Sequence, residues 1–110
     1  MSHRLLEGTI VSRGVVTGNV RVVTDPRDAV SVLPGEILVV PRSHPEFALG
    51  VMRASGLICE SGGVICHICT VALELGIPCV TEVEGATAIL RGASTITLDG
   101  DHGVVYDAAS

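Results

Sequence analysis

The stretch that decides the fold is residues 60–80, ESGGVICHICTVALELGIPCV. It follows a short apolar run, LIC at residues 57–59, and turns at the glycine pair Gly62-Gly63. An apolar and helix-favouring segment then continues to Leu75. This order predicts a buried strand, a glycine turn and a helix of about three turns that starts at Ile65 or Cys66.

The end of this helix is marked by two residues. Gly76 stands where a helix C-cap is expected, and Pro78 lies two residues beyond it. The pair Cys79-Val80 then predicts a brief strand. The stretch therefore reads as a strand–turn–helix–strand unit, and the rest of the chain is arranged around it.

A histidine, His67, and two cysteines, Cys66 and Cys69, lie at the mouth of the predicted helix. A helix N-terminus carries unpaired amides and a partial positive charge, and together these bind a phosphate dianion. Gly62 and Gly63 allow the backbone to approach closely, and the helix dipole keeps an imidazole neutral and nucleophilic. These features favour a phosphoryl acceptor at His67. An equally open interpretation is that His67 only caps or packs the start of the helix.

The composition indicates one compact domain over residues 1–110, of α/β or β-rich type, in which aliphatic side chains fill the core. The chain is 47% hydrophobic but only 2% aromatic, and it has 13 glycines. Its net charge is −5 and it has no basic run, which argues against binding to nucleic acid or to an anionic membrane. No apolar run reaches transmembrane length and no signal-peptide core is present, so we expect a cytoplasmic protein with reduced cysteines.

The remaining segments predict a mixed sheet with helices on one side and an extra β layer from the two ends of the chain. A turn is expected at Gly14 and again at Gly18-Asn19. The continuous apolar run at 36–40 predicts a strand covered on both faces. Helices are expected at 46–54 and 84–90, with a weak one at 27–33. Further strands are expected at 5–11, 19–23, 57–59, 95–98 and 104–106.

The pattern GG-x-x-C-H-x-x-x-x-A-x-E-L-G-I-P-x-V, from Gly62 to Val80, resembles a known family. It is similar to the phosphohistidine swivelling domain of the phosphoenolpyruvate-utilising enzymes, which include phosphoenolpyruvate synthase, pyruvate phosphate dikinase and enzyme I of the sugar phosphotransferase system. The flanking segments agree in order and spacing. GTIVSRGVVTGNVRVV resembles the family's opening β-hairpin, PGEILVVPRSHPEF its next segment, RASGLICESGG its strand before the glycines, and LDGDHGVVY its closing hairpin.

The resemblance implies an α/β domain with a three-layer β/β/α architecture and a mixed central sheet, acting as a mobile phosphocarrier. By this analogy His67 is phosphorylated, Gly62, Gly63 and the amides near Cys66 cradle the phosphate, and the Ser43 hydroxyl contacts the histidine region. The implied partners are an ATP-grasp nucleotide-binding protein and a phosphoenolpyruvate/pyruvate barrel. Mg²⁺ and ATP or phosphoenolpyruvate are expected on those partners, and no cofactor on this chain. With too little length for either partner, we expect a stand-alone carrier, which could also form a homodimer.

The chain departs from the best-known members at three positions near the histidine. It has Val64 and Ile65 where an arginine and a threonine are found, and Leu73 where an arginine follows the alanine. The departures remove two cations and one hydroxyl that would stabilise phosphate. The alternative function is therefore a non-catalytic binding or regulatory module that keeps the fold with a weakened site.

Other chemistries are possible at the same place. Cys66-x-x-Cys69 at a helix start resembles a redox pair, and Cys59, Cys66, His67 and Cys69 could be combined into a zinc site. Ser43 could equally be a helix cap. We expect solvation for His3, His44 and His102, and a solvent-facing position for Glu60 and Glu74. No metal site is predicted from the remaining acidic residues, which do not cluster: Glu36, Glu46, Glu82, Glu84, Asp99 and Asp101.

Overall fold

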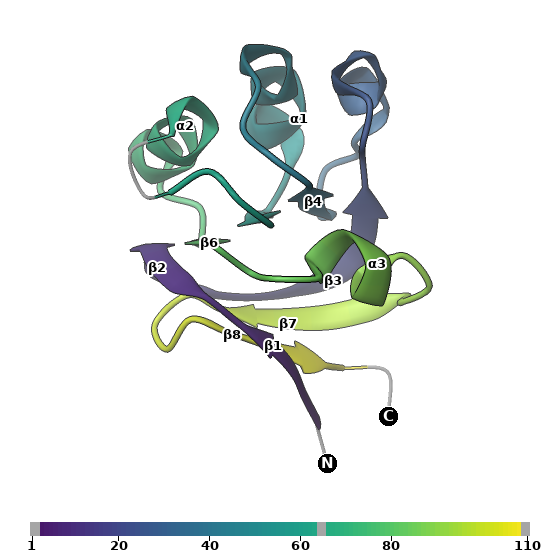
Figure 1. The fold of residues 1–110 in the computed structure, drawn as a ribbon, viewed down its shortest axis with the longest axis vertical. Coiled ribbons are helices and arrows are strands. Elements are labelled where there is room, and N and C mark those ends of the chain that lie inside the picture. The colour runs from purple at the N-terminus through teal and green to yellow at the C-terminus, as the bar shows by residue number, and fades with distance from the viewer. Residues whose placement is uncertain (1–2, 64–65, 109–110) are drawn as a thin grey trace.

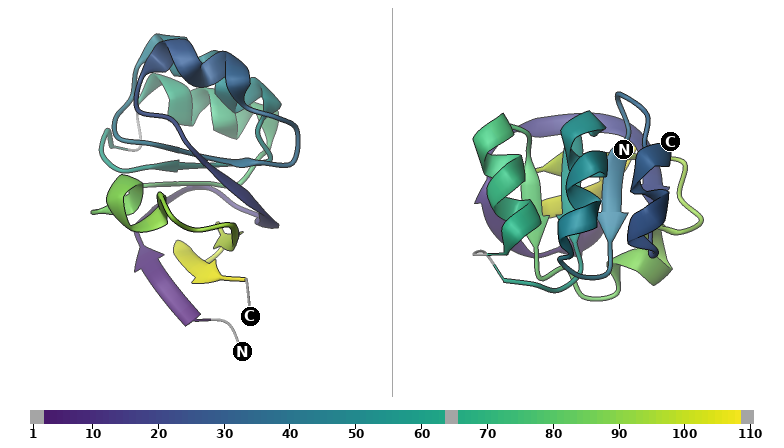
Figure 2. Two further views of the ribbon diagram at one scale, coloured as in Figure 1. Left: turned by 90° about the vertical axis from the view of Figure 1, so that its right-hand side faces the viewer. Right: turned by 90° about the horizontal axis from the view of Figure 1, so that it is seen from above.

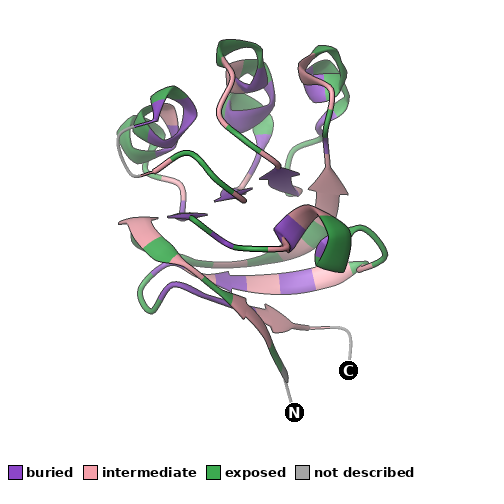
Figure 3. Ribbon diagram, in the orientation of Figure 1, coloured by how far each residue is buried: buried purple, intermediate pink, exposed green. Residues whose placement is uncertain are grey.

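Two short apolar strands form the centre of the molecule, β4 (Ile37–Val40) and β5 (Gly56–Cys59), which pair in parallel. Every residue in both strands is buried, as Figure 3 shows. Successive side chains of a strand point to opposite faces, so strands buried throughout must be covered on both faces. The two-sided strand predicted at 36–40 is therefore confirmed. The computed structural model describes residues 3–63 and 66–108.

The sheet is mixed, with eight strands in the order β1-β8-β7-β3-β4-β5-β6-β2. The strands β3, β4, β5 and β6 run parallel, and β2 adds antiparallel to β6. On the other side of β3 the pairs are all antiparallel. The remaining strands are β1 (His3–Glu7), β2 (Thr9–Ser12), β3 (Val15–Val22), β6 (Cys79–Thr81), β7 (Thr95–Asp99) and β8 (Val104–Asp107).

These elements form three layers, because the sheet folds over at β3 (Figure 1). One layer holds the helices α1 (Ala48–Arg53) and α2 (His67–Leu75) and the 3₁₀ helix η1 (Pro26–Ser31). Figure 2, seen from above, shows the three side by side over the parallel strands. The lower layer contains β7, β8 and β1. The expected α/β class, mixed sheet and β/β/α arrangement are confirmed.

Two apolar cores separate the layers. The helix-side core joins Leu38 and Val40 to Phe47, Val51 and Ile68. The sheet-side core joins the alternate residues of β4 to side chains of the lower layer, and contains Ile37, Val39, Ile58, Ile96 and Leu98. Fully burying each such side chain contributes roughly 1.5–3 kcal/mol, so this alternation largely determines which face of each strand meets which layer. No helix in the described part of the chain is long and apolar enough to cross a bilayer.

The N-terminal segment differs from its prediction. The single strand expected at 5–11 is broken at Gly8 into β1, which pairs with β8, and β2, which pairs with β6. At the break the Gly8 amide donates to the Gly103 carbonyl at 2.9 Å. The expected opening hairpin is also wrong, because β2 and β3 pair with other strands. The chain passes from one layer to the other at Gly8, and no local pattern signals that crossing.

The last helix, α3 (Ala86–Leu90), lies on the other side of the central strands from α1 and α2 (Figure 1). Ala86 and Leu90 are buried in the sheet-side core with Ile37 and Ile96. The expectation that all helices share one side is therefore wrong for α3. Its apolar face packs between the two β layers.

Gly18 does not lie in the turn that was predicted for it but inside β3. A Cβ at Gly18 would lie far inside van der Waals distance of the Gly35 carbonyl oxygen. The loop before β4 therefore packs directly on the β3 backbone, and only glycine leaves room for it.

We predict that Gly18→Ala lowers the free energy of unfolding by about 1–3 kcal/mol, the usual cost of overpacking. The measurement is chemical denaturation. Gly92→Ala is the matched control, since a Cβ there meets nothing within 4 Å, and we expect a change within about 0.5 kcal/mol. Equal effects of the two substitutions would contradict the close approach.

Candidate functional site

The helix α2 begins at His67, with Cys66 as its N-cap. Cys66 has extended backbone angles, and its Sγ accepts a hydrogen bond from the Cys69 amide at 3.3 Å. The other amides of the first turn have no acceptor within the helix and are oriented toward its N-terminal end. His67 is the first helical residue and is exposed to solvent. The predicted helix is thus confirmed, although it begins one residue after the expected start at Ile65 or Cys66. Val64 and Ile65 lie outside the described residues.

The other end of α2 is as predicted. Gly76 is the C-cap in the left-handed conformation, with a φ of 75°, and its amide donates to the carbonyls of Ala72 and Leu73. Leu73 itself is 54% exposed. This residue, one of the departures from the family pattern, therefore presents an apolar side chain to solvent on α2.

Three of the predicted site residues meet beside the start of α2. A Cβ built on Gly62 would lie 3.5 Å from the Cβ atoms of Ser43 and Cys66. Ser43 follows β4 and Gly62 follows β5, so these loops leave adjacent parallel strands at the same edge of the sheet, where such sheets bind ligands. Burial raises the pKa of the Cys66 thiol, and the interaction with the neighbouring Ser43 side chain opposes that rise in part. The Ser43 hydroxyl thus contacts the N-cap residue next to His67.

Ser43 is not itself a helix cap. That role belongs to His44, whose Nδ1 accepts a hydrogen bond from the Glu46 amide at 3.1 Å at the start of the 3₁₀ helix η2 (Pro45–Phe47). The His44 ring also meets Phe47 edge-on, with 6.3 Å between ring centres. His44 is half-buried rather than fully solvated, and its contacts serve the fold.

The amides of Gly62 and Gly63 both bind one carboxylate oxygen, Oε1 of Glu82. The N···O distances are 3.1 Å from Gly62 and 2.5 Å from Gly63. The two glycines have φ values of 148° and 68°. Consecutive amides that converge in this way form an anion-binding concavity. We call this pair of amides the glycine cradle.

Glu82 was missed as a site residue by the reasoning from sequence. It follows β6 directly and was expected to be one of several acidic residues that do not cluster. Nothing in its neighbours along the chain indicates that its carboxylate reaches back to a loop 20 residues earlier. A detectable sign is structural instead: Glu82 is the non-glycine residue with a positive φ, 55°, in the described chain.

Glu60, expected to face solvent, is half-buried and caps α3. Its Oε1 accepts from the Thr87 amide at 2.9 Å and from the Thr87 hydroxyl at 2.7 Å. These bonds lower the pKa of the Glu60 carboxyl. The end of β5 is thereby tied to α3, which helps to hold the loop that carries the cradle.

All four cysteines are free, buried and grouped in the helix-side core: Cys59, Cys66, Cys69 and Cys79. The Cys69 thiol interacts with the other three, and hydrogen bonds with Cys59 and Cys79 lower its pKa, but its side chain has no exposed surface. The hydrogen bond with Cys69, together with burial, raises the pKa of Cys59 and of Cys79. Burial is the larger cause for Cys66, whose pKa is also raised by Cys69. Thiols with raised pKa values and little exposure are poor nucleophiles. The arrangement favours packing over redox chemistry.

Metal binding finds no support in the part of the chain that the structure describes. No group of three or more histidine, cysteine, aspartate or glutamate side chains there could hold a metal ion. The zinc site combined from Cys59, Cys66, His67 and Cys69 is therefore not formed by the described residues.

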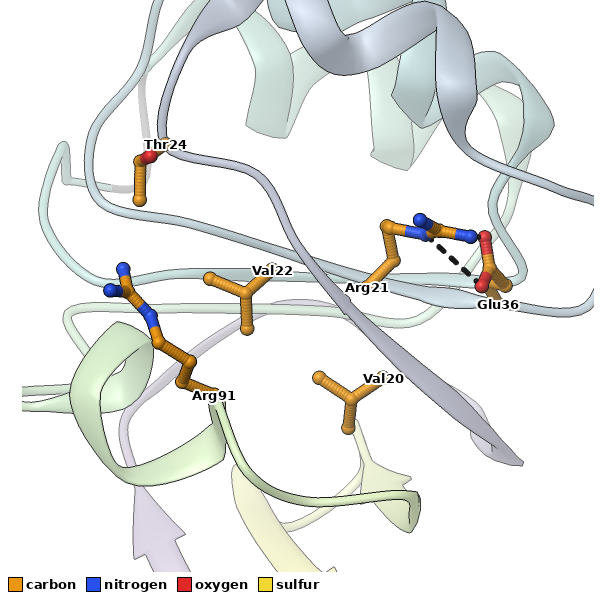
Figure 4. A pocket seen from close by; sticks show the side chains of 6 residues that line it. All are labelled: Val20, Arg21, Val22, Thr24, Glu36 and Arg91. Carbon is orange, nitrogen blue, oxygen red and sulfur yellow. Dashed lines mark hydrogen bonds and ion pairs between the residues drawn. The ribbon is translucent and has the colours of Figure 1, made fainter.

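A surface pocket of about 460 Å³ lies away from the predicted site (Figure 4). On one side of it the Nε of Arg21 donates to both carboxylate oxygens of Glu36, at 3.0 and 3.1 Å. Glu36 neutralises Arg21, so this arginine is less suited to bind a phosphate in the pocket. None of the predicted site residues lines it; the lining is Val20, Arg21, Val22, Thr24, Glu36 and Arg91.

Known proteins are similar to this chain over most of its length. The family model of the PEP-utilising enzyme, mobile domain, matches residues 32–103. The probable phosphoenolpyruvate synthase of Methanothermobacter thermautotrophicus is 35% identical over 105 residues, which cover 96% of this chain and 15% of that protein. The phosphoenolpyruvate synthase of Pyrococcus furiosus is 35% identical over 102 residues, covering 93% of this chain and 12% of that protein.

One further relative by sequence and one solved structure are also similar to this chain. Pyruvate kinase 2 of a Synechocystis species is 32% identical, covering 93% of this chain and 17% of that protein. The crystal structure of aconitase X from Thermococcus kodakaraensis has a TM-score of 0.63 over 91% of this chain and 95% of its own, at 20% identity, which shows a shared fold only. The chain spans 12 to 17% of the length of the three relatives by sequence. It belongs to the family of the mobile domain of the PEP-utilising enzymes.

Proposed function

We propose that this chain is a phosphocarrier whose His67 accepts a phosphoryl group and passes it on. The observation that carries the proposal is the pairing of an exposed histidine at the first position of α2 with a backbone cradle that holds an anionic oxygen nearby. A helix N-terminus and an amide concavity both favour a phosphate dianion. The family membership of the chain supports the same role.

The one reacting group that this chain must supply is the imidazole of His67. The lone pair of one ring nitrogen attacks the phosphorus of a donor, so that a P–N bond forms while the donor's P–O bond breaks and its electron pair leaves with the oxygen. Transfer to an acceptor reverses the step, breaking the P–N bond. The exposure of His67 leaves the ring open to both a donor and an acceptor.

We propose that the partners are an ATP-grasp nucleotide-binding unit and a phosphoenolpyruvate/pyruvate barrel, or another acceptor. These units would supply Mg²⁺ and bind ATP or phosphoenolpyruvate. Two of the relatives named above are phosphoenolpyruvate synthases far longer than this chain, which supports such partners. The four free thiols suit the reducing cytoplasm, where we place this exchange.

A second candidate function is a module that binds a partner or an anion without turnover. It is favoured by the exposed Leu73 on α2, where the best-known family members have an arginine, and by a cradle already filled by Glu82. A neutral side chain at position 73 gives a bound phosphoryl group no charge-assisted hydrogen bond. The assay below separates the two functions.

We predict that incubation with the two partner units and labelled ATP or phosphoenolpyruvate transfers label to this chain. The label should be base-stable and acid-labile, as phosphohistidine is, and His67→Ala should abolish it because the attacking nitrogen is gone. His102→Gln is the matched control, since His102 is exposed in the turn before β8 and pairs with Asp99; its label should equal that of the wild type. Partner binding that survives His67→Ala, with no label on any variant, would support the binding module instead.

The thiols provide a separate test of the redox alternative. We predict that all four react at least about tenfold more slowly with an alkylating reagent at pH 8 in the folded protein than in denaturant. Cys59, Cys69 and Cys79 have no exposed surface, while Cys66 is only 8% exposed and has a raised pKa, so little thiolate is present below that pKa. Mass spectrometry of the alkylated protein measures the rates. Rapid labelling of Cys66 in the folded protein would restore the redox interpretation.

A further inference from the structure

The cradle that should receive the phosphoryl group is occupied by a group of this chain. Oε1 of Glu82 accepts from the amides of both Gly62 and Gly63, at 3.1 and 2.5 Å. One oxygen shared by two consecutive amides fills the centre of the concavity. A phosphoryl oxygen seated there would have to take the place of this carboxylate oxygen.

The backbone that carries the Glu82 carboxylate has a conformation that glutamate rarely adopts. Its φ of 55° lies in the left-handed region, which is unfavourable for residues with a Cβ. Strain of this kind persists only where surrounding contacts over-determine it. Here Glu82 directly follows the fully buried strand β6, and its side chain makes the two cradle bonds.

The Glu82 side chain is exposed, which leaves it room to move. Glu82 belongs to a short connection between β6 and α3, and its carboxylate makes no described bond other than those to the cradle. A bound phosphoryl dianion and the carboxylate repel each other if both remain at the same amides. The two anions therefore compete for a single place.

We propose that Glu82 is a displaceable internal ligand of the glycine cradle, which fills the phosphate position while His67 is unmodified and leaves when a phosphoryl group arrives. This inference rests on the proposed function of His67. Glu82 would thereby favour the unphosphorylated carrier and raise the tendency of the phosphorylated carrier to give up its group. It is a positioning residue that acts through the cradle amides.

The opposite role, a permanent brace that keeps the glycine loop in shape, makes a different prediction. Glu82→Gln retains an oxygen that can accept from both amides but removes the charge, so a brace would survive it. Glu82→Gly removes the side chain and relieves the positive φ, because glycine adopts that region without penalty. If Glu82 competes with phosphate, both substitutions weaken that competition. If Glu82 only supports the loop, Glu82→Gly alone removes the support.

The first experiment titrates inorganic phosphate into the ¹⁵N-labelled protein and follows the amide signals of Gly62 and Gly63. We expect Glu82→Gln and Glu82→Gly to bind phosphate about tenfold more tightly than wild type, since charged ligands hold such amides more strongly than neutral ones. Glu84→Gln is the matched control: it removes an equal charge at an exposed residue two positions on, and its affinity should match that of the wild type. Thermal unfolding of each variant confirms that it is folded.

Three results would overturn the inference. These are unchanged affinity in both Glu82 variants, weaker affinity in Glu82→Gly, or cradle signals that do not respond to phosphate in any variant. The first would show that Glu82 does not compete, the second that it braces the loop, and the third that the cradle is not a phosphate site.

The second experiment repeats the labelling assay with the same variants. At a fixed donor concentration we expect Glu82→Gln to hold severalfold more label on His67 at equilibrium than the wild type, and Glu84→Gln to be unchanged. If the wild type is labelled and Glu82→Gln gains nothing, the inference fails while the phosphocarrier stands. If no variant is labelled but phosphate still binds more tightly to both Glu82 variants, the phosphocarrier fails while the competition at the cradle stands.

Discussion

The parallel pairing of β4 with β5 is the interaction on which the rest of the structure depends. Both strands are buried on both faces, so neither can slip by one residue without sending apolar side chains to the wrong core. The loops that leave their carboxyl ends are thereby fixed beside one another. That is why Ser43, from one loop, touches Gly62 and Cys66, from the other. The register of these two strands therefore determines where the site lies, and the side chains of the site act within that arrangement.

In the proposed carrier, the phosphoryl group would be held chiefly through backbone groups. The described anion contacts are those of the two cradle amides with Glu82, and the first turn of α2, Ser43 and Cys66 lie beside them. Charge-assisted bonds from arginine would hold phosphate more strongly, but Leu73 stands where the resemblance would place one. A carrier must release what it binds, and amide dipoles stabilise a phosphoryl group without the additional attraction of a full cation. Weak holding is therefore compatible with transfer, and it suits a carrier better than a storage site.

Local pattern was sufficient for the elements whose signals are local. The apolar run of β4, the helix ending at Leu75 and the glycine cap at Gly76 all depend on neighbours in the chain. The break at Gly8, the close approach at Gly18 and the side on which α3 packs depend on segments far away in sequence. For the site, sequence placed His67 at the helix start and Gly62 and Gly63 in the turn before it. It could not find Glu82, because a carboxylate that reaches a loop 20 residues earlier leaves no periodic signal.

The placement of Glu82 has a physical logic of its own. The cradle lies at the surface, where Gly62 is exposed and Gly63 is half-buried, so water can reach its amides when no ligand is bound. A carboxylate binds such amides more strongly than water because it is charged. An internal carboxylate satisfies them while the site is empty, at the expense of a left-handed backbone at Glu82. If the carboxylate leaves the cradle, one of the two constraints on this backbone is removed, while the buried strand β6 remains as the other. A strained ligand in a backbone cradle is therefore suited to a site that must be filled at rest and vacated in use.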